Sequence, residues 1–263
     1  MKRMTRLVAS LVGLTMLLLV AGPAGAITNG AVDGNGHPAV GALVVDFGDG
    51  AGRQVVCSGS LIARRVFLTA GHCTADLAAQ GVRDVWVSFA SAFTPSSPMI
   101  HGQYVTDPEF GVKPGNGTDP HDLAVVRLEQ DAGVTPVRLP TLGLLDSTKL
   151  KGQTFTAVGY GTTRSSKRGG PHAFGFDAVR RSATQSFLSL EPAWLNLSMN
   201  PSTGSGGGCY GDSGGPHFLS GSDSTLEVSI TITGDNVCRA TDKTLRLDTT
   251  AARQFLGQYV TLP

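Results

Sequence analysis

Charged and aromatic residues are scarce in this chain of 263 residues. Asp, Glu, Lys and Arg make up 16% of the sequence, and Phe, Trp and Tyr only 6%. The sequence has none of the common zinc-binding patterns, such as H-E-x-x-H, and we expect neither a metal nor a cofactor. Glycine is abundant at 35 residues, which indicates many tight turns rather than long helices. Hydrophobic residues make up 41%, enough for a folded core and too many for a disordered chain.

The first 26 residues have the layout of a secretion signal. Lys2, Arg3 and Arg6 precede the uncharged apolar run 7–20, and the small residues 24–26 (Ala-Gly-Ala) follow it. A signal peptidase recognises this order of basic, apolar and small residues. The alternative is a membrane anchor, but the run is shorter than the ~20 residues that span a bilayer. We expect residues 1–26 to be a signal peptide, and residues 27–263 to be secreted to the extracellular space and free of the membrane.

Removal of the signal peptide leaves a weakly acidic chain. It takes away three of the 21 Lys and Arg residues and none of the 20 Asp and Glu residues, so the formal charge becomes 18 − 20 = −2. Nucleic-acid binding needs clustered positive charge, which this balance does not provide. We expect a monomer with no nucleic-acid partner.

Short strands account for most of the mature sequence. Several segments alternate apolar with polar residues, as 225–233 does, which is typical of half-buried strands. A helix is indicated for residues 249–263, where apolar side chains recur at helical spacing, and a shorter one for 74–80. The predicted strands are Ala39–Asp46, Gln54–Ala63, Val66–Thr69, Val85–Phe89, Met99–Val105, Leu123–Glu129, Gln153–Gly159, Ala183–Leu190, Leu195–Met199, Pro216–Leu219, Leu226–Thr233 and Lys243–Asp248.

Many short strands separated by turn residues favour β-barrels or a β-sandwich. The segments 107–120 and 162–171 are rich in turn-forming or basic residues, and we interpret them as long loops. Segment 130–151 lacks strong periodicity, and we interpret it as the connection between two halves, 27–135 and 150–248.

Three short segments carry the residue types that nucleophilic catalysis needs. A serine hydroxyl is a weak nucleophile near neutral pH, and histidine, with an ordinary pKa of about 6.5, is the natural base for it. A buried carboxylate then fixes the tautomer of the histidine and stabilises its charged form. Glycines beside the serine let backbone N–H groups approach the oxygen on which charge develops. The segments are 68–73 (LTAGHC), 122–128 (DLAVVRL) and 211–216 (GDSGGP).

The glycine pattern around Ser213 also fits the G-x-S-x-G elbow of α/β-hydrolases, which are esterases and lipases. That fold requires the order Ser, acid, His along the chain. The only histidine after Ser213 is His217, which leaves no room for an acid and a crossover between them. The sequence also lacks the alternating helices of that fold, so we set the esterase alternative aside. Five histidines are interpreted as ordinary surface or core residues: His37, His101, His121, His172 and His217.

The segments around His72, Asp122 and Ser213 resemble the three signature segments of the chymotrypsin/trypsin family of serine peptidases (peptidase family S1). They occur in that family's order and at similar intervals, 50 and 91 residues. The resemblance extends from Ile27 to the C-terminal helix. Within the family, the Arg246-Leu247-Asp248 ending resembles that of bacterial secreted members.

The resemblance implies an all-β, chymotrypsin-like fold. That fold has two six-stranded antiparallel β-barrels and a C-terminal helix, with the active site in the cleft between the barrels. In this chain the peptidase domain would be 27–263, with an N-terminal barrel at 27–135, a C-terminal barrel at 150–248 and the helix at 249–263.

The resemblance also implies a role for each residue of the site. Ser213 matches the nucleophile, His72 the general base and Asp122 the acid that orients the base. The backbone N–H groups of Gly211 and Ser213 match the oxyanion hole.

Four cysteines in an exported chain indicate two disulfides. Four cysteines allow three pairings, and their spacing alone does not choose among them. The resemblance implies Cys57–Cys73 and Cys209–Cys238.

The expected substrate pocket departs from that of trypsin. In the family, the residue six positions before the serine sets the side-chain preference, and here it is Gly207. Together with Gly208 and Gly234 it implies an open pocket without an acid at its floor. We expect Phe, Tyr or Leu to be favoured over Arg and Lys before the scissile bond, because an uncharged pocket desolvates a cation at high cost. An acid at Asp242 would instead favour basic residues.

A second departure concerns the hydrogen bonds to Asp122. Family members usually have a serine that donates to the catalytic aspartate, and Ile232 stands at that position here. Either Thr231 or Thr233 substitutes for it, or Asp122 has one donor fewer, which would weaken its hold on His72.

The resemblance further implies a mechanism of activation. In the family, a new N-terminus beginning Ile-Val-Gly-Gly folds inward, and its amino group pairs with the aspartate just before the nucleophile. Here residues 27–30 (Ile-Thr-Asn-Gly) resemble that start and directly follow the signal site. We expect signal cleavage alone to generate the active N-terminus, with the Ile27 ammonium paired to Asp212.

Two functions from different classes follow. The first is a secreted serine endopeptidase, a hydrolase of protein or peptide substrates that acts through an acyl-enzyme. The alternative is a catalytically weak or silent homologue that serves as a binding module. Ile232 is the feature that favours the alternative, whereas all three triad positions are filled.

Overall fold

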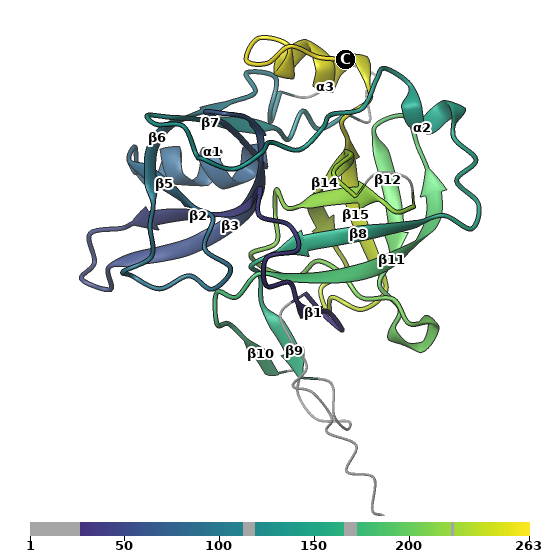
Figure 1. The fold of residues 1–263 in the computed structure, drawn as a ribbon, viewed down its shortest axis with the longest axis horizontal. Helices are drawn as coiled ribbons and strands as arrows, with labels where there is room; N and C mark the ends of the chain where they lie inside the picture. The colour runs from purple at the N-terminus through teal and green to yellow at the C-terminus, as the bar shows by residue number, and fades with distance from the viewer. Residues whose placement is uncertain (1–26, 113–118, 166–172, 222–223) are drawn as a thin grey trace, which may run out of the picture.

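The computed structural model of the protein describes residues 27–112, 119–165, 173–221 and 224–263, and the expected signal peptide lies outside them. Strands dominate, and they form two barrels that lie side by side in Figure 1. The elements of the first barrel region are β2 (Val40–Asp46), β3 (Arg53–Ala63), β4 (Val66–Thr69), α1 (Gly71–Ala79), β5 (Val85–Ser88), β6 (Ile100–Thr106) and β7 (Ala124–Leu128).

The remaining elements belong to the second barrel or flank it. They are β1 (Ala31–Val32), α2 (Leu144–Ser147), β8 (Thr154–Gly159), β9 (Thr163–Ser165), β10 (Ala173–Gly175), β11 (Arg181–Leu190), β12 (Trp194–Ser198), a short 3₁₀ turn (Pro201–Thr203), β13 (Pro216–Leu219), β14 (Glu227–Gly234), β15 (Thr241–Arg246) and α3 (Thr250–Leu256).

Both barrels are closed and antiparallel. The first has the order β2-β3-β4-β7-β6-β5, and β2 pairs with β5 to close it. The second has the order β11-β12-β15-β14-β13-β8, and a direct pairing of β11 with β8 closes it. Within each of these two barrels, closure leaves no strand with an unpaired edge. The expected all-β fold with two six-stranded barrels and a C-terminal helix is confirmed.

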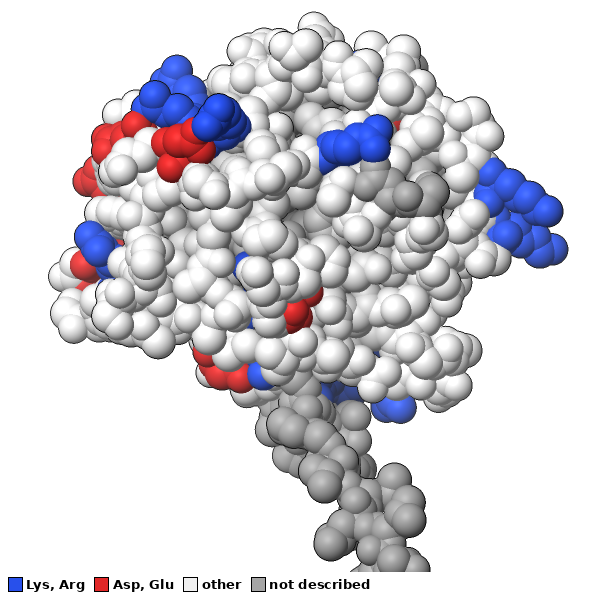
Figure 2. Space-filling view, in the orientation of Figure 1, with Lys and Arg blue, Asp and Glu red and all other residues white. Residues whose placement is uncertain are grey.

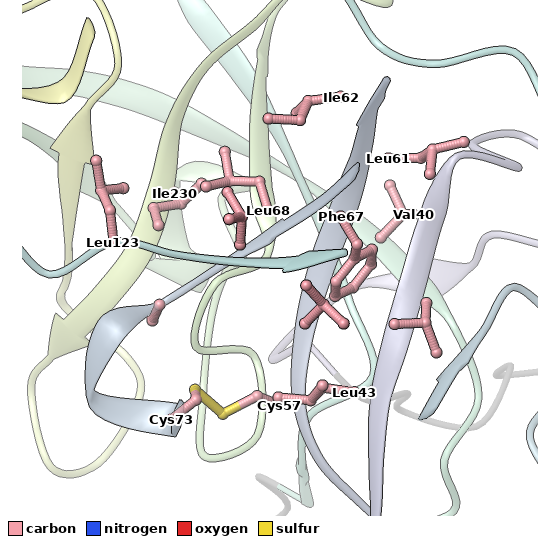
Figure 3. Close-up of a cluster of buried hydrophobic side chains, with 14 of the residues drawn as sticks. Val40, Leu43, Cys57, Leu61, Ile62, Phe67, Leu68, Cys73, Leu123 and Ile230 are labelled. Atoms are coloured by element: carbon pink, nitrogen blue, oxygen red, sulfur yellow. A yellow bond between two sulfur atoms is a disulfide. The ribbon is translucent and has the colours of Figure 1, made fainter. Parts of the chain in front are cut away.

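One apolar cluster holds the two barrels together. Its residues come from the interior of the first barrel, from the second barrel and from α3. Figure 3 shows Ile230, from β14 of the second barrel, beside Leu68 of the first, with Phe67 and Leu61 further into the cluster. A separate cluster around Phe155 fills the second barrel. The barrels therefore share a core, which fixes the cleft between them.

A buried arginine adds a polar link between the barrels. The guanidinium of Arg180 donates to Asp33 (3.0 Å), to the carbonyl oxygens of Gly34 (2.7 Å) and Val40 (2.9 Å), and to the hydroxyl of Tyr160 (3.2 Å). Buried charges are tolerated when they are paired and hydrogen-bonded in this way. Arg180 thus ties the N-terminal segment to the start of β2 and to the end of β8.

The C-terminal helix is shorter than its sequence pattern indicated. The Thr249 side chain caps α3 by accepting a hydrogen bond from the Ala252 N–H. The helix buries Ala252, Phe255 and Leu256 and ends before Gly257. In the described ranges no helix is long and apolar enough to cross a membrane.

The surface carries little charge, as the composition indicated. In Figure 2 most of the visible face is neither acidic nor basic, and the Lys and Arg side chains lie in small separate groups, several of them beside acidic ones. This face has no broad basic patch.

Glu227, at the start of β14, is a buried acid between the barrels. Its Oε2 accepts a hydrogen bond from Ser60 Oγ of β3 (2.5 Å), and its Oε1 has no partner among the described residues. Burial raises the pKa of Glu227 from its ordinary value of 4.5 to about 8. The folded chain therefore keeps this proton at a pH where the unfolded chain has released it.

We expect the free energy of unfolding to fall as pH rises from about 4.5 to about 8, and then to level off with respect to this group. A raised pKa corresponds to about 1.4 kcal/mol per unit, so the loss is a few kcal/mol. The Glu227→Gln variant keeps the shape of the side chain but has no group that ionises. Urea unfolding at pH 5 and pH 8.5 checks this, and the variant should lose less stability than the wild type. An equal loss in both proteins would contradict the assignment.

Candidate active site

The strand pairing of the first barrel brings His72 next to Asp122. Strand β4 pairs with β7, with Thr69 opposite Ala124, so the chain leaving β4 runs beside the chain entering β7. His72 is the second residue of α1, which follows β4 directly, and Asp122 lies just before β7. Two hydrogen bonds join them: His72 Nδ1 to Asp122 Oδ2 (2.8 Å), and the His72 N–H to Asp122 Oδ1 (2.7 Å).

These bonds fix the tautomer of His72. A carboxylate only accepts hydrogen bonds, so Nδ1 carries the hydrogen and Nε2 is left as the basic nitrogen. The Asp122 side chain is 7% exposed, whereas that of His72 is 30% exposed. The pair thus combines a buried carboxylate with an imidazole ring that solvent can reach.

The Ser213 loop is held against the His72 side of the first barrel. The Ser58 N–H of β3 donates to the Ser213 carbonyl oxygen (3.0 Å), and Ser58 Oγ donates to that of Gly211 (3.0 Å). A Cβ on Gly214 would lie 2.4 Å from Thr69 Oγ1, so only glycine fits beside the residues that precede His72. The structure therefore brings the loop and the His72–Asp122 pair to the same place, between the barrels.

Two backbone N–H groups of this loop are free to bind an anion. Gly211 has a φ of 92°, in the left-handed region that favours glycine. In the described part of the chain, the N–H groups of Gly211 and Ser213 have no acceptor, whereas those of Asp212, Gly214 and Gly215 do. An unpaired pair of N–H groups beside a serine suits the oxygen of a tetrahedral intermediate.

Both disulfides that the resemblance implied are present. Cys57–Cys73 joins β3 to α1, one residue away from both Ser58 and His72, and Figure 3 shows it at the edge of the apolar cluster. Cys209–Cys238 joins the Ser213 loop to the segment after β14. Cys57 and Cys73 lie close to His72, but sulfurs joined in a disulfide are not thiolate ligands for a metal.

Asp212 is buried beneath the loop. It accepts hydrogen bonds from the N–H groups of Gly161 (2.8 Å) and Cys209 (2.9 Å). Burial raises its pKa to about 7, with a further increase from the charge of Asp242, and the two backbone donors oppose the rise. Among the described residues, no side-chain cation forms an ion pair with Asp212.

Ile27, the expected partner of Asp212, is also buried. It is 1% exposed and packs against Ala157 and Ala183, and the neighbouring Thr28 pairs with Gly207. The Ile27 nitrogen is part of a peptide bond in the full-length chain and carries no charge there. The pairing of an Ile27 ammonium with Asp212 remains a prediction for the cleaved chain.

A cavity of about 170 Å³ opens next to Ser213. Gly208, Gly234 and Asp242 are among the residues that line it, and Gly207 is not. A Cβ on Gly207 would lie 2.0 Å from the Gln185 amide nitrogen, so that space is already filled. The expectation that Gly207 forms the floor is corrected: the side chains of Gln185, on β11, and of Met199, just after β12, take that space, and Asp242 forms part of the wall.

The sequence model of the trypsin family matches residues 31–245, most of the chain. The chain belongs to the trypsin family. Membership of this family supports a serine peptidase.

Known trypsin-family relatives resemble the chain at low identity. A chymotrypsin from Phaedon cochleariae is 28% identical over 208 residues, and the match covers 70% of this chain. The chain spans 65% of the length of that chymotrypsin. Kallikrein-8 from Rattus norvegicus and from Mus musculus are each 26% identical over 202 residues, which cover 73% of this chain and 72% of theirs.

This trypsin-family member departs from the usual pattern at the donor to Asp122. Within the described residues, neither Thr231 nor Thr233 donates a hydrogen bond to Asp122, whose donors are the two groups of His72. Two outcomes were expected for Ile232. The structure has the one in which Asp122 has one hydrogen-bond donor fewer than is usual in the family.

Three residues of the site were not predicted from the sequence. Ser58 holds the Ser213 loop, while Gln185 and His217 both donate to Asp242. Ser58 follows Cys57, and its position beside a disulfide cysteine was the one available signal. His217 was interpreted as an ordinary core residue, and nothing in the local sequence indicates its contact with a residue 25 positions away.

Proposed function

We propose that the protein is a secreted serine endopeptidase that cleaves peptide bonds through an acyl-enzyme on Ser213. The observation that carries the proposal is the His72–Asp122 pair held beside a loop whose Gly211 and Ser213 N–H groups lack acceptors. Family membership supports the reaction class. The layout of residues 1–26 supports secretion.

In the proposed reaction, Ser213 Oγ attacks the carbonyl carbon of the scissile bond while its proton passes to Nε2 of His72. The N–H groups of Gly211 and Ser213 stabilise the negative charge that develops on the carbonyl oxygen. His72 then gives the proton to the leaving amine, and the C–N bond breaks. Water then attacks the acyl-enzyme while its proton passes to His72, the bond between the acyl carbon and Ser213 Oγ breaks, and His72 returns the proton to Oγ as the acid product leaves.

The second candidate is a catalytically weak or silent homologue that acts as a binding module. The missing donor at Ile232 favours it, because Asp122 then holds His72 without the usual additional support. The filled triad positions and the unpaired N–H groups favour the peptidase.

Titration with a serine-reactive phosphonate or sulfonyl fluoride separates the two candidates. A peptidase should lose activity in proportion to one molar equivalent of reagent, with the adduct on Ser213 in the digested protein. The matched control is Ser96→Ala, which removes an exposed serine of the first barrel region and should label normally. A folded wild-type chain that takes up no reagent would support the binding module.

A further inference from the structure

A second cavity, of about 460 Å³, borders the Ser213 loop. Gly211, whose N–H has no acceptor among the described residues, lines this second cavity, and Ser213 does not. Tyr210 lines both the second cavity and the cavity next to Ser213, so it forms a wall that the two share. The reaction centre therefore has a binding space on each side of Tyr210.

The walls of the second cavity are mostly apolar. They include Val55 and Val56 of β3, Phe93, and Phe176 and Ala178 from the segment that follows β10. None of its described lining residues is acidic, and the one that is basic is Arg53, whose guanidinium lies over the Trp86 ring, 4.3 Å from the centroid. A cation would find no partner here, whereas an apolar side chain would find apolar contacts.

Two aromatic side chains of the second cavity are exposed to solvent. The exposed fraction is 51% for Phe176 and 56% for Tyr210. Apolar surface that remains in water is stabilised when an apolar ligand covers it. An incoming apolar side chain would lose its own contact with water and would cover both rings.

The walls are held in place by contacts within the protein. The Tyr210 hydroxyl donates to the Asn236 carbonyl oxygen (3.1 Å), and its ring meets the Phe174 ring edge to face, with centroids 5.5 Å apart. Phe174 lies on β10, which with β9 forms the pair of strands below the two barrels in Figure 1. The Phe93 N–H donates to the Ala178 carbonyl oxygen (2.9 Å), which ties the walls from the two barrels together. Little of the binding free energy is therefore spent on ordering the cavity.

The position of His72 indicates which half of a substrate reaches the second cavity. In the proposed reaction the leaving amine takes its proton from His72, so the leaving half lies on the His72 side of Ser213. The β3 wall is on that side, because Val56 directly precedes Cys57, and the disulfide of Cys57 to Cys73 joins this end of the wall to the residue after His72. The acyl half stays bonded to Ser213, and its nearest side chain enters the cavity that Ser213 lines.

We propose that the second cavity holds a large apolar side chain, such as Leu or Phe, from the leaving half of the substrate, and that Phe176 and Tyr210 determine this preference. The inference rests on the proposed peptidase function and deepens it. The occupant is the substrate polypeptide itself, because the cavity continues directly from Gly211, a residue of the proposed oxyanion hole. The protein therefore selects its substrates by a residue after the scissile bond, independently of the cavity next to Ser213.

Partitioning of the acyl-enzyme between water and an added amine tests the second cavity by itself. One activated ester supplies the acyl group, so the acyl half is the same in every measurement. The nitrogen of a dipeptide amide bonds to the acyl carbon, the bond from that carbon to Ser213 Oγ breaks, and the amine proton passes through His72 to Oγ. The ratio of peptide product to acid product then measures how well the dipeptide amide binds on the leaving side.

We expect an apolar side chain in the dipeptide amide to raise this ratio. The better of Leu-Gly amide and Gly-Leu amide should exceed Gly-Gly amide at least tenfold, because a Leu side chain becomes buried. The corresponding Lys amides should exceed Gly-Gly amide less than threefold. Phe176→Ser should reduce the Leu gain to less than threefold, and Phe176→Asp should make the Lys amide the better acceptor. The matched control is Leu188→Ser on β11, which removes a side chain that is 50% exposed and lines neither cavity, and it should keep the full Leu gain.

Equal ratios for the Leu and Gly amides in the wild type would overturn the inference, and so would a full Leu gain in folded Phe176→Ser. Circular dichroism checks the fold of each variant. Should neither Phe176 variant fold, the wild type decides through a dipeptide amide that carries a photoreactive Phe analogue. Crosslinks to residues 53–56, 93 or 176–178 are expected, and crosslinks confined to other residues would refute the inference.

The same experiment separates this inference from the proposed function. An acyl-enzyme that forms on Ser213 and hydrolyses, but shows no preference among the amides, would refute the apolar preference and leave the peptidase intact. Failure of every activated ester to acylate Ser213 would refute the peptidase and this inference with it.

Discussion

Replacing Ser213 by alanine is expected to lower kcat/KM for peptide hydrolysis by about 10⁴- to 10⁶-fold. Without Oγ no acyl-enzyme forms, and what remains is the stabilisation from the oxyanion hole and from binding. His72→Ala should cost a similar factor, and the double variant little more, because the two groups act in the same proton transfer. The measurement is kcat/KM on one peptide substrate for all three variants.

The chain should still fold in these variants, since Ser213 contributes its carbonyl oxygen rather than its hydroxyl to the contact with Ser58. Circular dichroism and thermal unfolding check this. Ser96→Ala, at an exposed turn, serves as the control and should keep full activity. A folded Ser213→Ala protein within tenfold of wild-type turnover would show that another residue is the nucleophile.

One extra residue placed before Ile27 is expected to lower kcat/KM by about 10²- to 10³-fold, the cost of losing an oxyanion-hole donor. The physical reason lies in Asp212, whose buried carboxyl has a pKa raised to about 7 and forms no ion pair with a side chain in the described part of the protein. An Ile27 ammonium beside it would favour the carboxylate and order the 211–213 loop. An added residue would move that ammonium away from its partner.

The same pairing predicts a pH profile. An amino group that gains a buried partner has its pKa raised above the free value of about 7.7–8.0. The pair is therefore complete below the free value and is lost as pH rises through the raised one. Activity should therefore fall in alkaline solution. Mass spectrometry of the secreted protein should show that Ile27 is its N-terminal residue. A mature chain that starts well downstream of Ile27 would rule this mechanism out, and so would an extended variant with full activity.

Strands were the most predictable part of the fold, because their apolar alternation is local. Strand β13 matches its predicted bounds, and β3 begins one residue earlier than predicted. Helix α2, in the segment we interpreted as a connection, was not predicted. It has four residues and is held by Asp248, whose Oδ2 accepts from the Leu145 N–H (2.7 Å). A turn fixed by a residue about a hundred positions away leaves no periodic pattern.

The β9–β10 hairpin shows a related limit. Strand β9 (Thr163–Ser165) lies in the segment 162–171 that we interpreted as a loop. Its three residues pair with 173–175, and strands this short give too few alternations to be recognised. Residues 166–171 of that expected loop lie outside the described residues.

The candidate triad could be found from sequence because each member sits in a distinctive local segment. The pocket could not, because its wall is assembled from the loop before Ser213, from β14 and the segment that follows it, and from Asp242 of β15. Counting back from Ser213 identified Gly207, but Gln185 reaches across from β11 and fills the space beside it. From the sequence, Asp242 was considered only as an acid that would favour basic residues, and no contact between His217 and Asp242 was predicted. Their contact depends on barrel closure, which local patterns do not encode.

The central claim is that Ser213 forms an acyl-enzyme, and a burst measurement tests it most directly. The mature protein is mixed with an activated ester in stopped flow, acid-quenched and analysed by mass spectrometry. We predict a rapid release of leaving group at one equivalent per active chain, followed by slower turnover, with the acyl mass on Ser213. Steady release without a burst is not decisive alone, because deacylation can be fast. Hydrolysis that survives unchanged in Ser213→Ala, or an acyl group on any other residue, would contradict the account.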